Sequence, residues 1–479
     1  MITHDVIIVG AGPVGLVVAC ELAQAGVDAA LVDRSPRDHS SGHSRANVVW
    51  TRNLELLNRI GVTDRLIEEG HRIRGTSFHA DGVALGSASL ASLSDTPYPF
   101  ALMIPQGTTE RVLHERAQEL GVQLYPGLTL EDLSADPDGV TAAFEGQGGP
   151  VILRSRWLVG ADGVRSTVRE LAGIESRSSA PDVTFAICDA HLDTPLSGQH
   201  SHYLWSSYGA MAVGPMGGAL HRLAVNAPHD VGTPDGDHFA RRLREVGGPR
   251  HAIRGLEWSA SFRVVCHVAE TFRKGRILLA GDAAHVVSPA GGQGMNTGIG
   301  DAVNLGWRLA AVLRSGDDKG LDDYNSERRL GAAKSELVSN LMTRAGLVRR
   351  PITRRARNLA VRTAGRVGVL DRHLAPALAQ TALDYGEMGL RRGVDRGARL
   401  PVLPSAHPRS AWQVGWPVLA RDVPTLLHRH GADVREADLP RGTQRLEVPE
   451  GFRPLRQALS SGVTGVLVRP DGHVQQVLR

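Results

Sequence analysis

Three short turns in this chain combine glycine with aspartate in a way that suits a phosphate-containing ligand. They are Gly10–Gly15 (GAGPVG), Gly160–Ser166 (GADGVRS) and Gly281–Asp282, the last followed by a loop over 288–294 with three more glycines. Glycine lets a ligand lie directly against the backbone, and the N–H groups at a helix N-terminus attract anions. A loop so rich in glycine is costly to order without a ligand. The three turns predict one extended ligand that is touched at several points.

The first turn has the spacing of a dinucleotide-binding site. Its residues are Gly10, Gly12, Pro13 and Gly15. A buried strand over Asp5–Val9 precedes it, a helix follows to about Gly26, and a second strand over 29–32 ends at Asp33. The Asp33 carboxylate would accept hydrogen bonds from a ribose and repel a 2′-phosphate, a repulsion that Arg34 beside it weakens. FAD or NAD is therefore expected rather than NADP, and a Rossmann-like fold without a dinucleotide is the alternative.

The other two turns also stand where predicted strands end. The strand Val151–Val159 leads into the second turn, and Arg276–Ala280 leads into the third. After the loop of the third turn, apolar residues recur at helical spacing from Met295 to Leu313. A strand, a carboxylate, a glycine loop and a helix N-terminus together predict an anion and dinucleotide site. An ordinary strand–loop–helix connection is the alternative.

The composition limits the class of protein. The chain has 479 residues, of which 42% are hydrophobic, so sizeable cores and about three domains are expected. A net charge of +4 argues against a dedicated nucleic-acid-binding protein. The three cysteines, Cys20, Cys188 and Cys266, are too far apart for a zinc or dithiol motif, and no metal is expected. No apolar run approaches the roughly 20 residues that span a bilayer, so we expect a cytoplasmic protein without a membrane partner.

A different pattern begins near residue 184. Short alternating segments up to 265 predict an antiparallel sheet inserted into the first domain. In its strand over 200–206, the side chains of Tyr203 and Trp205 share a face and are candidates for a pocket wall; a packed sheet face is an equally good reading. Upstream, Met103–Leu113 predicts a strand that enters a helix capped by Thr108 or Thr109.

The C-terminal third is predicted to be helical and then to form a small α/β unit. Helix is expected over about 322–370, with a basic run at 349–357 that indicates a solvated face; a dimer or polyanion contact is the alternative. A linker rich in proline and glycine over 397–408 precedes the α/β unit. That unit closes with a strand over 465–468, a Pro-Asp-Gly turn and a strand that ends at Leu478.

With these residues in view, the chain resembles the group A flavoprotein monooxygenases, the aromatic hydroxylases of the p-hydroxybenzoate hydroxylase fold. GAGPVG resembles their FAD-binding turn, GADGVRS their DG motif, and GDAAHVVSPAGGQGMNTGIGDAVNLGWRL over 281–309 their GD motif and flavin-ring loop. The bacterial polyketide and antibiotic hydroxylases are the most similar members. Their C-terminal thioredoxin-like domain lacks redox cysteines and closes in a phrase similar to VLVRPDGHVQQVLR over 466–479. The family loop usually reads GIQDA, whereas this chain has Gly300 before Asp301.

The resemblance implies the residues of an FAD site. Asp282 would bind the ribityl or pyrophosphate part, and the segment Pro289–Asn296 would lie along the isoalloxazine. Arg45 and Gln106 match family positions near FAD. The implied set is Gly10, Gly12, Pro13, Gly15, Asp33, Arg34, Arg45, Gln106, Asp162, Asp282, Pro289, Gly292, Gly294, Met295 and Asn296.

The resemblance also implies a reaction and its partners. NAD(P)H, with NADPH the expected coenzyme, would reduce FAD; the reduced flavin would capture O2 as a hydroperoxide that hydroxylates a bulky aromatic or polyketide substrate. The catalysis is centred on the flavin, so no catalytic side chain is assigned. Baeyer–Villiger or epoxidising chemistry, a Rossmann-type dehydrogenase and a non-catalytic flavin-binding partner are the alternatives. A monomer or homodimer is expected.

The expected architecture is an α/β fold with a Rossmann-like FAD-binding domain, an inserted antiparallel substrate sheet and a C-terminal thioredoxin-like domain. The FAD-binding domain would comprise residues 1–183 and 266–347, with about 76–104 joining the substrate sheet. The sheet would comprise 184–265, a helical connector 348–396, and the thioredoxin-like domain 397–479.

Overall fold

The computed structural model describes most of the chain. The described residues are 2–36, 46–178, 183–227, 232–385, 398–400, 423–428, 434, 439–440, 442–448 and 463–478. Arg45 and most of the predicted linker lie outside these ranges. Among the described residues, no helix is both long enough and apolar enough to cross a bilayer.

The largest sheet carries all three glycine turns. Its central strands are parallel and lie in the order β20 (Ile277–Leu279), β11 (Val151–Gly160), β1 (Ile2–Val9), β2 (Ala29–Asp33) and β8 (Gln123–Pro126). The strands β9 (Thr129–Ala135), β10 (Val140–Glu145) and β19 (Arg273–Lys274) join by antiparallel pairing. Because β1, β11 and β20 are parallel neighbours, their carboxyl ends meet at one edge. Each of these strands is followed by one of the turns, so the fold brings the turns together.

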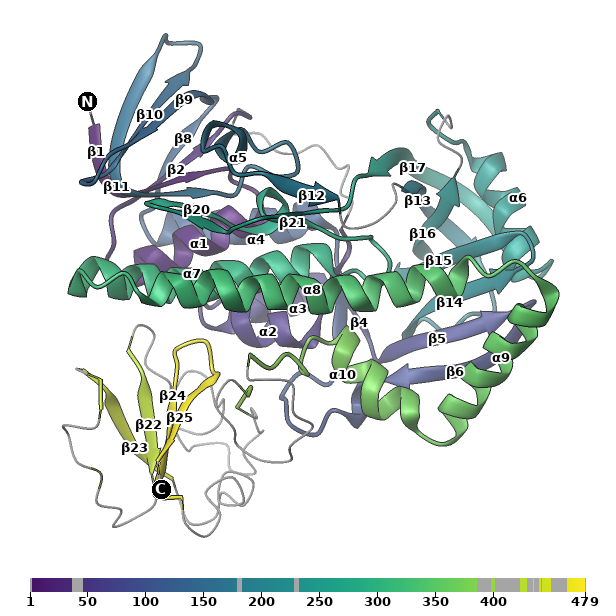
Figure 1. Ribbon diagram of the computed structural model, residues 1–479. Coiled ribbons are helices and arrows are strands. Elements are labelled where there is room, and N and C mark those ends of the chain that lie inside the picture. The colour runs from purple at the N-terminus through teal and green to yellow at the C-terminus, as the bar shows by residue number, and fades with distance from the viewer. Residues whose placement is uncertain are drawn as a thin grey trace.

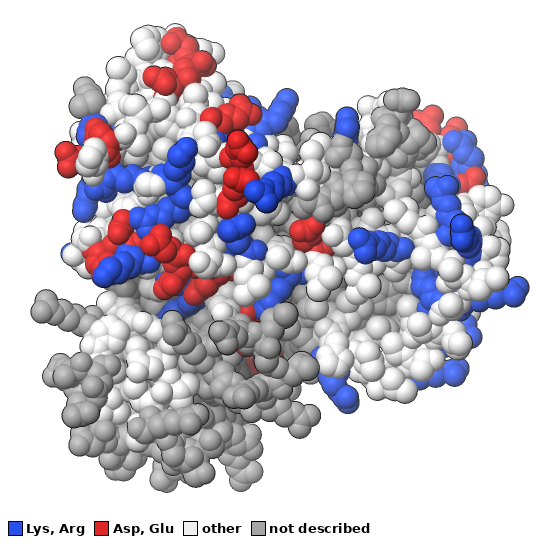
Figure 2. Space-filling model, viewed as in Figure 1, with Lys and Arg blue, Asp and Glu red and all other residues white. Residues whose placement is uncertain are grey.

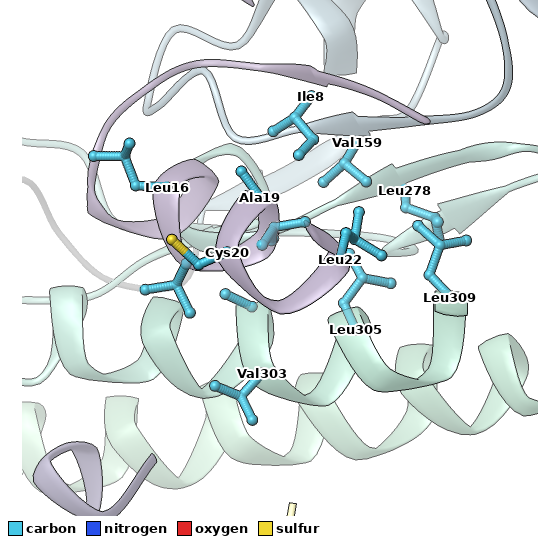
Figure 3. Packing of buried hydrophobic residues seen from close by; sticks show 14 of the residues in the cluster. Ile8, Leu16, Ala19, Cys20, Leu22, Val159, Leu278, Val303, Leu305 and Leu309 are labelled. Carbon is cyan, nitrogen blue, oxygen red and sulfur yellow. The ribbon is translucent and has the colours of Figure 1, made fainter. Parts of the chain in front are cut away.

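One face of this sheet is covered by a buried helix. α1 (Pro13–Gln24) lies between the sheet and α7 (Gly294–Ser315), as Figure 3 shows. Ile8, Val159 and Leu278 of the sheet face α1 from one side, Val303, Leu305 and Leu309 of α7 lie on the other, and all are at most 1% exposed. α1 is therefore apolar on nearly every side. Each fully buried leucine stabilises this layer by about 1.5–3 kcal/mol.

Further helices complete the first layer. They are α2 (Thr51–Asn58), α3 (Thr63–Glu69), α4 (Gln106–Glu119), α5 (Thr167–Leu171) and α8 (Gly320–Gly346). α4 packs on α1, and α8 packs on α7 and extends towards the second sheet (Figure 1). α4 begins at Gln106, with Pro105 at the N-cap, so the predicted threonine cap is wrong. Thr109 is buried and its hydroxyl donates to the Pro105 carbonyl instead.

The second sheet is mixed rather than purely antiparallel. Its order is β17 (Ala252–Val264), β13 (Val183–Asp193), β16 (Leu220–Ala227), β15 (Gly209–Gly217), β14 (His200–Ser206), β5 (Gly75–Ala80) and β6 (Val83–Ser89). β5 comes from the chain before the insertion and pairs with β14 in parallel, from His200 against Gly75 to Trp205 against Ala80. α6 (Gly236–Gly247) covers one face through Phe239 and Leu243. The other face turns towards the glycine loop.

Three smaller sheets complete the described chain. β3 (Val48–Val49), β7 (Ala101–Met103) and β4 (His71–Ile73) form the first; β12 (Ser176–Ser178), β18 (His267–Ala269) and β21 (His285–Val286) form the second. The third lies near the C-terminus, in the order β23 (Gln444–Glu447), β22 (Thr425–His428), β24 (Gly465–Val468) and β25 (Val474–Leu478). Residues 90–104 thus lie outside the second sheet, in the short helix η1 (Leu90–Ser92) and β7.

The chain after α8 wraps around the second sheet. α9 (Pro351–Arg366) has no buried residue and is followed by the π-helical turn η3 (Leu370–Leu374) and α10 (Ala375–Leu378). Two arginines of its basic run nevertheless have protein partners, because Arg354 pairs with Asp81 at 2.6 Å and Arg357 lies over the Trp205 ring. On the face shown in Figure 2, acidic and basic side chains are interspersed over the first sheet.

Candidate functional site

The first turn contains two glycines with different surroundings, one packed against the backbone and one facing open space. A Cβ on Gly15 would lie 1.9 Å from the Gly10 carbonyl oxygen, so only glycine lets α1 approach β1 this closely. Gly12, the N-cap of α1, has no atom within 4 Å of its ideal Cβ position and faces open space. The Asp33 carboxylate accepts the Ala11 N–H at 2.6 Å and the Ser35 N–H at 2.8 Å. Asp33 therefore braces the turn from the end of β2.

The second turn is held by Asp162. Its carboxylate accepts the Ser166 hydroxyl at 2.5 Å and the Val168 N–H at 3.0 Å, which fixes the start of α5. Burial raises the pKa of Asp162, and these hydrogen bonds oppose the rise. The neighbours Ala161 and Gly163 face the cavity described below, whereas Asp162 does not line it.

The third turn is supported by a buried ionic group. Asp301 of α7 accepts the Gly281 N–H at 3.0 Å, His285 Nε2 at 2.6 Å and Arg328 Nε at 2.6 Å. Burial would raise the pKa of Asp301, but His285 and Arg328 outweigh it and hold that pKa below its usual value. The exposed Asp282 carboxylate lies at the cavity, one residue beyond this support.

The glycine loop before α7 is fixed by Asn296. Its Oδ1 accepts the Trp50 N–H at 2.8 Å, and its Nδ2 donates to the carbonyl oxygens of Val48 and Gly292, both at 2.8 Å. Gly292 has φ +62°, and a Cβ there would lie 2.2 Å from Val48 Cγ1. Asn296 is fully buried and does not line the cavity, so the amide shapes the loop from behind.

The three turns and the loop enclose one cavity of about 480 Å³, within the range of ligand sites. Its lining includes Gly12, Pro13, Gln106, Ala161, Gly163, Asp282, Pro289, Gly292, Gly294 and Met295. Gly294 opens α7 and, like Gly12, has no atom within 4 Å of its Cβ position. Two helix N-termini, each with a glycine that has no protein atom near its Cβ position, therefore face the same cavity, which fits a ligand carrying a pyrophosphate. Arg34 is exposed and does not line this space.

A second cavity adjoins the first. Its lining includes Tyr203, Trp205, Met211, Ala224 and Met342, and five residues line both cavities: Asn47, Val48, Phe262, Pro289 and Gly292. The glycine loop and the face of the second sheet thus form its opposite walls. Tyr203 and Trp205, whose spacing left a pocket wall and a packed sheet face equally open, are both lining residues of this cavity.

Aromatic side chains organise the wall of the second cavity. Phe78 of β5 does not line the cavity itself but stacks on both Tyr203 and Trp205, with ring centroids 5.9 Å and 5.4 Å away. The Tyr203 hydroxyl accepts the Gly291 N–H at 2.8 Å, which ties the sheet to the glycine loop. Burial raises the pKa of Tyr203, so the phenol stays protonated at neutral pH. Phe78 lies in the stretch 76–104 that was expected to join this sheet, but nothing in the sequence singled out its ring.

The fold and these cavities define a class of protein, a dinucleotide-binding enzyme with a second, apolar ligand site beside the first. A family model described as FAD binding domain matches residues 3–338. The chain therefore belongs to the FAD-binding domain family, and it is an FAD-dependent monooxygenase like the relatives that follow.

The relatives are similar over most of their length. A 12-dehydrotetracycline 5-monooxygenase/anhydrotetracycline 6-monooxygenase of Streptomyces rimosus is 34% identical over 98% of this chain and 94% of its own. A rifampicin monooxygenase of Streptomyces venezuelae is 35% identical over 68% of each chain. The solved structure of an anhydrotetracycline hydroxylase from Streptomyces rimosus matches with a TM-score of 0.80 at 31% identity, covering 100% of this chain and 96% of that one.

Proposed function

We propose that this monooxygenase hydroxylates a bulky, polycyclic aromatic substrate of the polyketide type, with electrons from NAD(P)H. The observation that carries the proposal is the shared wall between the two cavities, at Val48, Phe262, Pro289 and Gly292. A ring in the second cavity and a flavin in the first would meet there. The tetracycline- and rifampicin-modifying activities in the relatives' names support a large substrate of this kind.

We infer that FAD lies in the first cavity. The N-termini of α1 and α7 would receive its pyrophosphate, beside Gly12 and Gly294, and Asp282 would accept hydrogen bonds from its polyol. Pro289, Gly292 and Met295 line the cavity and would lie along the ring system. Asp33, Asp162 and Asn296 support the site by shaping its turns, as their hydrogen bonds indicate.

FAD, when bound, supplies the redox chemistry, accepting hydride from a nicotinamide and activating dioxygen. The chain's own contribution is to position the substrate and to exclude water. Tyr203 and Trp205 line the second cavity and offer aromatic surface against which a fused-ring substrate would pack, while Phe78 supports both rings. The Tyr203 hydroxyl, fixed by Gly291, holds a proton beside the glycine loop, where it can hydrogen-bond to a substrate oxygen.

We propose that the functions of the chain are divided among domains whose bounds follow the sheets. Residues 1–183 and 266–347 hold FAD, 184–265 with β5 and β6 hold the substrate, and 348–396 connect them to a C-terminal unit over 397–479. The order β23-β22-β24-β25, with one parallel and two antiparallel pairings, supports a thioredoxin-like fold for that unit.

The test is turnover of a panel of polycyclic phenols and quinones under isotopically labelled dioxygen. We expect selected compounds to stimulate NAD(P)H oxidation and to gain one labelled oxygen atom as a new hydroxyl group. A labelled lactone or epoxide would reassign the chemistry to Baeyer–Villiger oxidation or epoxidation. Oxidation that continues without oxygen would indicate a dehydrogenase, and bound FAD with no stimulation by any compound would favour a non-catalytic partner.

A further inference from the structure

A tight turn near the C-terminus packs into the helical layer that carries the glycine loop. The turn joins β24 to β25 and comprises Arg469–His473, and we call it the C-terminal turn. Arg469, Asp471 and His473 are only 6%, 3% and 2% exposed. Burying two charged side chains is unfavourable unless each is paired. The partners of this turn therefore show what it does in the fold.

One set of partners lies on α2. Arg52 donates NH2 to the Asp471 carbonyl oxygen at 2.8 Å and NH1 to Glu55 at 3.0 Å. Arg59 donates to the Pro470 carbonyl and, through two nitrogens, to Glu21 of α1 at 3.0 and 2.9 Å. Both arginines are buried. Without the turn, each would lose one of its acceptors.

A second set lies on α7 and α8. The Asp471 carboxylate accepts Asn304 Nδ2 at 3.1 Å and Arg469 NH2 at 2.6 Å, and Arg469 also pairs with Glu327 at 2.5 Å. Burial would raise the pKa of Asp471, but Arg469, His473 and Arg308 hold it far below its usual range, with Arg469 the largest favourable contributor. The turn is thus bonded to three helices of the flavin-binding layer at once.

Two of these three helices, α2 and α7, begin beside the glycine loop. The residues at the start of α2, Trp50 and Asn53, bond to Asn296 at 2.8 and 2.9 Å, and Asn296 lies in the first turn of α7. A separate path runs through Tyr385, whose ring lies 4.4 Å from that of His473 and whose hydroxyl accepts Arg328 NH1 at 2.6 Å. Arg328 in turn pairs with Asp301, which holds Gly281. The C-terminal turn therefore reaches both the glycine loop and the Gly281–Asp282 turn through short chains of buried contacts.

We propose that the C-terminal turn is a positioning element of the flavin site, which fixes the spacing of α2 and α7 and thereby the loop at which FAD binds. Asp471 of the turn and Tyr385, whose ring contacts His473 of the turn, are the positioning residues; neither lines the cavity. Because coupling between two sites is reciprocal, FAD must tighten the docking of the turn as much as the turn tightens FAD binding.

The first test uses the full-length wild-type chain and needs no substrate. Hydrogen–deuterium exchange is compared between the FAD-free and FAD-bound protein, in peptides covering 289–296, 464–478 and, as a reference outside the proposed path, β6. We expect FAD to slow exchange in 464–478 together with 289–296, and more than in β6. Slowing confined to 289–296 would overturn the proposal, whether or not the enzyme hydroxylates anything.

The second test uses two mild variants and a matched control on the same unit. Tyr385→Phe removes only the hydroxyl that Arg328 contacts, and Asp471→Asn removes one charge; Arg445→Gln alters an exposed arginine of β23. We expect the first two to raise the Kd for FAD about fivefold or more and to shift the visible spectrum of the bound flavin, with Arg445→Gln unchanged. Wild-type Kd and spectrum in a folded Tyr385→Phe protein would contradict the proposal.

Discussion

A methyl group added at Gly15 would clash with the protein, whereas one added at Gly12 would not. Substitutions at these two glycines therefore test folding and FAD binding separately. Gly15→Ala would place a methyl group 1.9 Å from the Gly10 oxygen, so α1 must move off β1; we expect unfolding to become easier by about 3 kcal/mol. Gly12→Ala meets no protein atom within 4 Å, so its stability without FAD should equal that of the wild type. Its methyl group would instead occupy the space of the ligand and weaken FAD binding.

The measurements are thermal unfolding of the FAD-free proteins and FAD titration. The pair is its own control, because both changes add the same methyl group to the same turn. A Gly12→Ala protein that binds FAD as tightly as the wild type would refute the placement of the pyrophosphate at this turn.

Asp282 is the carboxylate of the cavity that we expect to contact FAD directly. Asp282→Ala should raise the Kd for FAD about tenfold or more, since a hydrogen bond to a charged group contributes about 1.5–3 kcal/mol. Asp138→Ala, a change at an exposed carboxylate in the turn between β9 and β10, should leave the Kd unchanged. Titration of FAD-free protein by flavin fluorescence measures both, and equal affinities would reject the role of Asp282.

Residue types and spacing were sufficient to predict the three turns, the loop and the face that Tyr203 and Trp205 share. They were not sufficient to say which polar side chain faces the ligand. Asp33 and Asn296 remain predicted at FAD, and the hydrogen bonds that they make to backbone groups give each of them a second purpose, to hold the turns. A carboxylate or amide beside a glycine can serve either purpose, and only the direction of the side chain decides between them.

At the scale of elements, β14 and its neighbours carry a cluster of histidines on the face away from the second cavity. His202 bonds to His79 at 3.2 Å, and His200, His221 and His251 lie close by. Burial is the main cause of the lowered pKa of each, and it brings the pKa of His202 from 6.5 to about 4. The folded protein therefore binds fewer protons than the unfolded chain between about pH 4 and pH 6.5.

It follows that stability rises with pH through this interval and falls as the solution is acidified. We expect the melting temperature of the FAD-free protein to decrease steadily from pH 7 to pH 4.5. His202→Asn should flatten this decrease, whereas His114→Asn, outside the cluster, should not. Differential scanning calorimetry measures the slope, and equal slopes for His202→Asn and the wild type would exclude His202 as a contributor.

Element type was easier to predict than element partners. The alternating pattern over 184–265 correctly indicated strands, and the apolar spacing after Met295 correctly indicated the helix α7. The start of α4 was misplaced because the buried Thr109 bonds within the helix rather than capping it. The parallel pairing of β5 with β14 could not be read from either strand, since alternation reports which face is buried and not which neighbour lies alongside.

At the scale of the whole molecule, two cavities with a common wall should respond separately to substitutions away from that wall. Ala224→Leu would narrow the second cavity alone. We expect it to raise the KM of a stimulating aromatic compound about tenfold, as loss of roughly 1.4 kcal/mol of binding requires, with an unchanged Kd for FAD. Ala135→Leu, an exposed alanine of β9, should change neither quantity.

Steady-state kinetics and FAD titration give the two numbers. A parallel loss of FAD from Ala224→Leu would show that the cavities are not independent. Residues of about 76–104 were expected to join the substrate sheet, but the pairing of β5 with β14 itself and the C-terminal turn between α2 and α7 escaped prediction. They join segments more than a hundred residues apart, and no local periodicity records such a pairing.

The origin of the second sheet has a practical consequence for protein engineering. Five of its strands come from the insertion over 183–264, but β5 and β6 come from 75–89; Thr76 on β5 lines the second cavity, and Phe78 packs on Tyr203 and Trp205. A chimaera that exchanges only the insertion between two relatives would combine Tyr203 and Trp205 equivalents from one parent with a Phe78 equivalent from the other. A chimaera meant to transfer substrate specificity should therefore exchange both segments together, which requires four crossover points. Exchange of one segment alone should yield an enzyme that binds flavin but positions its substrate wrongly.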